Sequence, residues 1–134
     1  MIIRITQDTR IKSLQEKFRR EFPFLKLGVI DFSYVPENGA RTGRNKNPFI
    51  SIFPQAGKEV TEGILKIHPW SKTATVEKGF EDLGLLVRIM RRTAYTWMRT
   101  TETNELSLEE QNELGRRSVA HYRNSLWMER ETLL

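Results

Sequence analysis

The sequence predicts a mixed α+β fold, and three patterns predict it. A helix that leads into a strand occurs twice, at residues 14–27 and 76–87. A pair of strand-forming segments follows the second copy. A capping box then opens a C-terminal helix. We therefore expect two helix-strand units on a mostly antiparallel sheet, with a C-terminal helix.

Length and composition narrow the class of protein. The chain has 134 residues, which suits a single domain over 1–134, with residues 119–134 as a helical extension or an interface. It has no cysteine, which excludes disulfides and thiolate metal sites and fits the cytoplasm. No run approaches the roughly 18 apolar residues of a membrane span. We expect a soluble cytoplasmic protein with no membrane partner.

The first unit begins with a strand at residues 2–6, where apolar and polar side chains alternate. Asp8 or Thr9 can cap the helix that follows, whose apolar residues recur at helical spacing: Ile11, Leu14, Phe18 and Phe22. Pro23 ends this helix because proline cannot donate the next backbone hydrogen bond. An extended segment is expected over residues 25–34.

The second unit repeats the pattern. Val76 and Phe80 match Leu14 and Phe18, and the match then needs a one-residue gap before Gly84. A short strand at residues 64–67 precedes it, Thr73 or Thr75 can cap its helix, and Gly84 closes that helix in the left-handed conformation. Duplication of the helix-strand unit is the hypothesis.

Between the two units, residues 36–48 have no apolar periodicity and contain two glycines. This pattern predicts a long exposed loop before a strand at residues 49–53.

The segments 85–91 and 96–101 are rich in strand formers and predict a hairpin. With Thr93 and Ala94 as its turn, Ile89 would lie opposite Met98, and Arg88 opposite Arg99. One face would be apolar, and the other would place two like charges opposite each other.

Ser107 and Glu110 have the spacing of a capping box, so a helix is expected to start there. Its last turns carry more apolar surface than one stripe needs. These side chains either complete the monomer core or form a two-fold interface between copies: Tyr122, Leu126, Trp127 and Leu133.

The segment 87–112 resembles the C-terminal part of a family of small conserved bacterial proteins of unknown function. The residues that carry the resemblance are Arg91, Trp97, Thr100, Thr101, Thr103 and the run 108–112. The N-terminal strand, helix and Phe-Pro-Phe-Leu segment are similar too. The resemblance implies a compact α+β domain and implies nothing about mechanism. This chain departs from the family pattern by continuing from Val119 to Leu134.

Groups that support catalysis are scarce. His68 and His121 are the only histidines, and neither has the spacing of a metal ligand pair. The segment 39–46 lacks the ending of a phosphate-binding loop. We therefore expect no catalytic residue, no metal and no cofactor, and an enzyme is the least favoured class.

The sequence favours a non-catalytic binding or assembly protein, either a homodimer or the partner of another protein. The alternative is a nucleic-acid-binding accessory protein, since the net charge is +5. Its cations would come from the basic loop and from the hairpin face beside Trp97 and Tyr95: Arg41, Arg44, Lys46, Arg88, Arg92 and Arg99.

Overall fold

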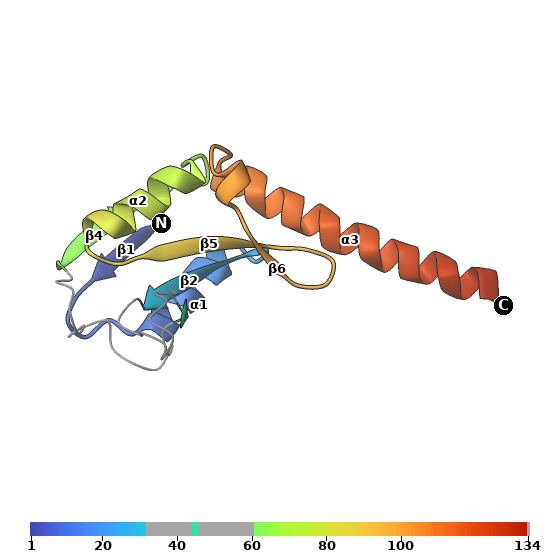
Figure 1. The fold of residues 1–134 in the computed structure, drawn as a ribbon, viewed down its shortest axis with the longest axis horizontal. Coiled ribbons are helices and arrows are strands. Elements are labelled where there is room, and N and C mark those ends of the chain that lie inside the picture. The colour runs from blue at the N-terminus through green and yellow to red at the C-terminus, as the bar shows by residue number, and fades with distance from the viewer. Residues whose placement is uncertain (32–43, 46–60, 134) are drawn as a thin grey trace, which may run out of the picture.

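The computed structural model describes residues 1–31, 44–45 and 61–133, and the predicted α+β class is confirmed (Figure 1). The described strands form two antiparallel sheets, one with the order β1-β4 and one with the order β3-β2-β5-β6. The elements are β1 (Ile2–Ile5), α1 (Ile11–Glu21), β2 (Leu25–Asp31), β3 (Arg44–Asn45), β4 (Gly63–Lys66), α2 (Thr73–Asp82), β5 (Val87–Arg92), β6 (Trp97–Arg99), a short 3-10 helix (Thr101–Thr103) and α3 (Leu108–Leu133).

Two units with the same order of elements, β1-α1-β2 and β4-α2-β5, pair with each other strand by strand. Equivalent positions lie 62 residues apart without any gap, so that Ile3 corresponds to Leu65 and Leu27 to Ile89. In both sheets these equivalent residues lie directly opposite each other. This is the arrangement expected for two repeats related by an approximate two-fold rotation. The gap in the sequence match is therefore not needed.

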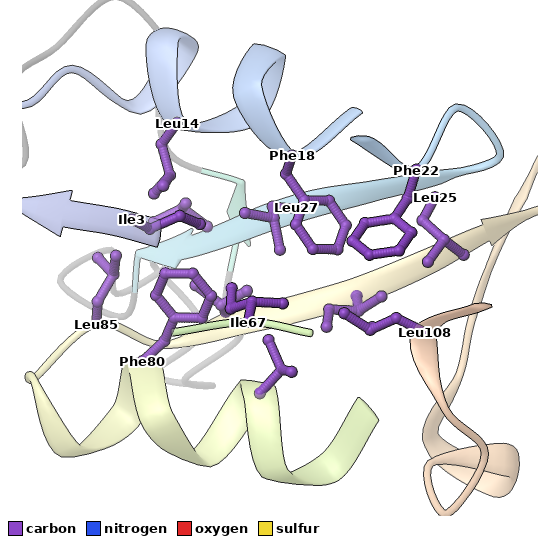
Figure 2. Packing of buried hydrophobic residues seen from close by; sticks show 14 of the residues in the cluster. Ile3, Leu14, Phe18, Phe22, Leu25, Leu27, Ile67, Phe80, Leu85 and Leu108 are labelled. Atoms are coloured by element: carbon purple, nitrogen blue, oxygen red, sulfur yellow. The ribbon is translucent and has the colours of Figure 1, made fainter. Parts of the chain in front are cut away.

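The core lies where the two repeats meet. Figure 2 shows Phe18 of α1 and Phe80 of α2 pointing into one cluster with residues of the strands between them. The strand residues Leu25, Leu27 and Ile67 are also buried there. Burying each such side chain contributes about 1.5–3 kcal/mol. Each repeat therefore depends on the other for its apolar cover.

The helix ends are only partly as predicted. Pro23 follows the C-cap residue of α1, and Gly84 has a φ of 83°, which confirms the left-handed end of α2. The predicted side-chain caps are wrong, because the N-cap residues are Arg10 and Lys72 and neither makes a capping bond from its side chain. In α2 the first backbone N–H groups instead donate to the carbonyls of Leu106 and Asn104.

Two of the residues predicted as caps, Thr9 and Thr73, form other hydrogen bonds instead. The Thr9 hydroxyl accepts a hydrogen bond from the N–H of Thr6, inside the turn before α1. The Thr73 hydroxyl donates to the carbonyl of Leu106 at 2.9 Å. Neither hydroxyl therefore caps a helix. That of Thr9 stabilises the turn before α1, and that of Thr73 joins the start of α2 to the segment before α3.

The hairpin forms, but its predicted register is wrong by two residues. Arg92 lies opposite Trp97, and Met90 opposite Arg99. The loop is Ala94 and Tyr95, because the Thr93 hydroxyl donates to the carbonyl of Thr96 and accepts from its N–H. Arg88 and Arg99 therefore do not face each other. A shift of two residues keeps each side chain on its predicted face.

The capping box at the start of α3 is confirmed. The N–H of Ser107 donates to the Glu110 carboxylate, and the N–H of Glu110 donates to the Ser107 hydroxyl, each at 3.2 Å. Leu108 is buried in the core, and a Cβ added to Gly115 would lie 2.8 Å from the Cβ of Phe24. This first half of the helix is therefore tightly packed against the sheet.

The second half of α3 extends away from the rest of the molecule (Figure 1). Tyr122 still meets Tyr95 of the hairpin loop, with ring centroids 4.7 Å apart. The helix then continues to Leu133. No helix in the described ranges is long and apolar enough to cross a membrane.

The predicted loop at residues 36–48 lies outside the described residues except for 44 and 45. Those two residues form β3, which pairs with Ile30 and Asp31 of β2, so a strand replaces loop there. The predicted strand at 49–53 lies outside the described residues.

Candidate functional site

Strand alternation separates two faces of the larger sheet. Leu25, Leu27 and Val29 of β2 are buried, as are Val87 and Ile89 of β5. The residues between them point to the opposite side, which we call the outer face. By the register of the strands, the outer face of β2, β5 and β6 carries four cations beside one methionine and one tryptophan: Lys26, Arg88, Met90, Arg92, Trp97 and Arg99.

Three cations converge on the indole of Trp97. The Nζ of Lys26 lies 4.9 Å from the ring centroid, the Cζ of Arg19 5.0 Å, and the Cζ of Arg92 5.6 Å. They come from β2, α1 and β5, so the site exists only in the folded chain. Each cation over an aromatic face gains about 0.5–1 kcal/mol at an exposed position. We call these four residues the Trp97 cluster.

The Trp97 cluster carries a local excess of positive charge among the described residues. In the part of the chain that the structure describes, no salt bridge joins Arg19, Lys26 or Arg92 to a carboxylate. Burial lowers the pKa of Lys26, and the nearby charges of Arg19 and Arg92 lower it further. The three cations therefore repel one another, and an anion among them would relieve that repulsion.

The structure brings together only some of the residues that the sequence singled out for nucleic acid. Arg88, Arg92 and Arg99 share the outer face. Arg41 and Lys46 lie outside the described residues, and of Arg44 only the backbone, within β3, is described.

Arg19 and Lys26 were missed by the sequence analysis. They are far in sequence from the hairpin, on the first helix and on the strand after it. The signal was available in the alternation of β2, which places Lys26 on the face opposite Leu25 and Leu27.

Of the four residues predicted for an interface, the structure describes the side chain of Tyr122 alone. Tyr122 is half-buried and packs edge-on against Tyr95 of the same chain, so its contact here is internal. Leu126, Trp127 and Leu133 belong to α3, but their side chains lie outside the described part.

A groove of about 570 Å³ lies along the start of α3, lined by Leu106, Glu109, Glu110, Glu113, Leu114 and Arg117. Two of its three carboxylates, those of Glu110 and Glu113, have hydrogen-bond partners. A hydrogen bond from Arg116 lowers the pKa of Glu113 to about 2, and Arg117 adds a second. Glu110 is held by the capping box. The groove is therefore less strongly charged than its composition suggests.

Other chemical groups are dispersed. Within the described ranges, no three histidine or carboxylate side chains gather where they could hold a metal ion. His68 stacks on Trp70, with ring centroids 4.5 Å apart. The Trp97 cluster is thus the strongest candidate site. Comparison of the chain with protein-family models, curated proteins and solved structures finds no match.

Proposed function

We propose that this chain is a non-catalytic binding protein whose outer face binds the phosphate backbone of single-stranded nucleic acid. One observation carries the proposal: three cations without a described acidic partner converge on Trp97. Arginine and lysine neutralise phosphates and release counterions, which supplies most of the affinity of such complexes.

The shape of the surface favours a polymer over a small anion. Arg88 and Arg99 extend the positive charge along the same face, beyond the Trp97 cluster. An open sheet face with spaced cations suits a chain of phosphates. The net charge of +5 would also raise the rate of encounter with a polyanion.

The aromatic residues favour single strands. Trp97 is partly exposed, and Tyr95 at the tip of the hairpin is 77% exposed. Proteins that bind single strands combine a positive surface with aromatic rings on which unpaired bases stack. A duplex keeps its bases stacked on each other, so it would use the cations alone.

The test is binding of a short fluorescein-labelled oligothymidylate, followed by anisotropy at several salt concentrations. We expect affinity to fall linearly on a log-log plot as salt rises, and a duplex of the same length to bind more weakly. The double variant Arg92→Gln, Arg99→Gln should lose most of the binding. The double variant Arg116→Gln, Arg117→Gln is the matched control, because both arginines are exposed on α3 and pair with Glu113. Absence of binding at low salt would contradict the proposal.

The proposal places this binding in the cytoplasm. The absence of cysteine suits a reducing compartment.

A second candidate function, assembly into a homodimer, is favoured by one feature of α3. The helix continues to Leu133, beyond its contact with Tyr95 (Figure 1). Its last turns contain Leu126, Trp127 and Leu133, and aromatic residues are enriched at such interfaces.

A further inference from the structure

The two repeats allow equivalent positions to be compared within one chain. Gln15 and Glu77 are equivalent, 62 residues apart. The Nε2 of Gln15 donates to the carbonyl of Leu27 at 2.8 Å, and the N–H of Ile89 donates to the Glu77 carboxylate at 2.9 Å. In each repeat, therefore, a helix side chain bonds the same strand position. An amide and a carboxylate both serve this structural role.

The charges around these positions differ between the repeats. Lys26 is equivalent to Arg88, so each repeat has a cation at this place on the outer face. In the second repeat burial raises the pKa of Glu77, and the hydrogen bond from Ile89 and the charge of Arg88 oppose that rise. In the first repeat the corresponding residue is the neutral Gln15. The cation at position 26 therefore has a neutral amide at the position where its equivalent has a carboxylate.

The last turns of the two helices also differ in charge, with the first repeat again the less acidic. α1 ends with Arg19 and Arg20, and α2 ends with Glu81 and Asp82. The negative C-terminal end of a helix favours cations, which accounts for basic residues at the end of α1. It does not account for the convergence of Arg19 with Lys26 and Arg92 on one ring.

We infer that a phosphodiester binds the outer face at a point centred on Lys26 of the first repeat, flanked by Arg19 of that repeat and by Arg92 of β5. The equivalent place around Arg88 has Glu77 and Glu81 at the positions of Gln15 and Arg19, so its charge is compensated and it contributes less to binding. This inference rests on the proposed function and names the residues within the outer face that hold phosphate. Arg19 and Gln15 are then the positions that determine which repeat contributes more to binding.

The test exchanges the charges of the repeats. Arg19→Glu gives the first repeat the residue that stands at the equivalent position 81 of the second. We expect this variant to bind the labelled oligothymidylate at least tenfold more weakly, and the slope of log affinity against log salt to fall by about one. Arg20→Glu is the matched control, since it makes the same charge change in the same helical turn and Arg20 has no described contact with Trp97. Arg20→Glu should lose clearly less affinity.

The reciprocal variant changes the second repeat. Glu77→Gln with Glu81→Arg reproduces the amide and the arginine of the first repeat, and the amide oxygen introduced at position 77 can still accept the hydrogen bond from the N–H of Ile89. We expect tighter oligonucleotide binding and a salt slope steeper by about one. Circular dichroism spectra and thermal melts of every variant establish that it is folded.

The outcomes separate the two proposals. Equal losses in Arg19→Glu and Arg20→Glu, with the wild type still binding, would mean that only overall charge matters and would overturn the inference alone. A wild-type chain that binds no oligonucleotide at low salt would overturn the proposed function itself. A first-repeat exchange that weakens binding while Arg20→Glu does not would support both.

Discussion

Phe18 and Phe80 occupy equivalent positions in the two repeats, and neither side chain has any solvent exposure. Each extends from one helix into the cluster that both repeats share (Figure 2). Their positions make the two helices mutually dependent, because each phenylalanine packs in a core to which both repeats contribute.

We predict that Phe18→Ala and Phe80→Ala each lower the free energy of unfolding by about 3–5 kcal/mol, since each leaves a large cavity. Urea denaturation measures the loss. Ile64→Ala is the control, because Ile64 is exposed on β4 and its truncation should cost little. If one phenylalanine variant were as stable as the wild type, that residue would not belong to the shared core.

The second prediction concerns Gln111, a fully buried amide of α3. Its Oε1 accepts from Arg91 at 2.8 Å, and its Nε2 donates to the carbonyl of Thr103 at 2.7 Å. Gln111→Leu would leave both partners without this bond, so we expect a loss of about 1–3 kcal/mol. Glu109→Gln, at an exposed position of the same helix, should change stability little. Equal stabilities of the two variants in urea would contradict a structural role for this amide.

The third prediction separates binding from folding at Lys26. Its pKa is lowered by burial and by Arg19 and Arg92, so its charged form is disfavoured in the folded protein. Lys26→Gln should therefore leave the melting temperature unchanged or raise it, while affinity for the oligonucleotide falls. Such a trade-off is expected where a site is kept for function at a cost in stability. A large fall in melting temperature would show instead that Lys26 is needed for folding.

The fourth prediction is a pH dependence caused by Glu77. Burial raises its pKa above the ordinary value of 4.5, against the opposing effects of the Ile89 N–H and Arg88. Between 4.5 and the raised value the folded state binds more protons than the unfolded state, so stability falls as pH rises through this window. Glu77→Gln should flatten that part of the profile, measured as the urea midpoint at each pH. An unchanged profile would assign the dependence to other groups.

Local signals were enough to predict much of the fold. Pro23, Gly84 and the Ser107 capping box mark element ends through their own backbone chemistry, and the structure has each of them in that role. Periodicity likewise placed Phe18 and Phe80 in the core.

Features that depend on distant residues were not predictable in the same way. The hairpin register depends on hydroxyl bonds between Thr93 and Thr96, which a search for two-residue turns with glycine or asparagine does not detect. The caps of α2 were missed because carbonyls near Leu106 satisfy its first N–H groups. The Trp97 cluster joins Arg19 to a hairpin more than seventy residues later, and only the pairing of β2 with β5 brings them together.

The last prediction concerns the end of α3. The described contacts of this helix with the rest of the chain, which include those of Leu108, Gln111, Gly115 and Tyr122, lie before Asn124. Deletion after Asn124 removes Leu126, Trp127 and Leu133 but none of these contacts. We therefore expect residues 1–118 to stay folded and the protein to shift from dimer to monomer in multi-angle light scattering. A full-length protein that is monomeric at high micromolar concentration would contradict the dimer. An unfolded truncation would show that the end of the helix belongs to the monomer core.

Trp127→Ala in the full-length chain distinguishes these cases, because it keeps the helix and removes one large aromatic side chain. A dimer held by this surface should dissociate more readily, and the thermal melt of the monomer should be unchanged.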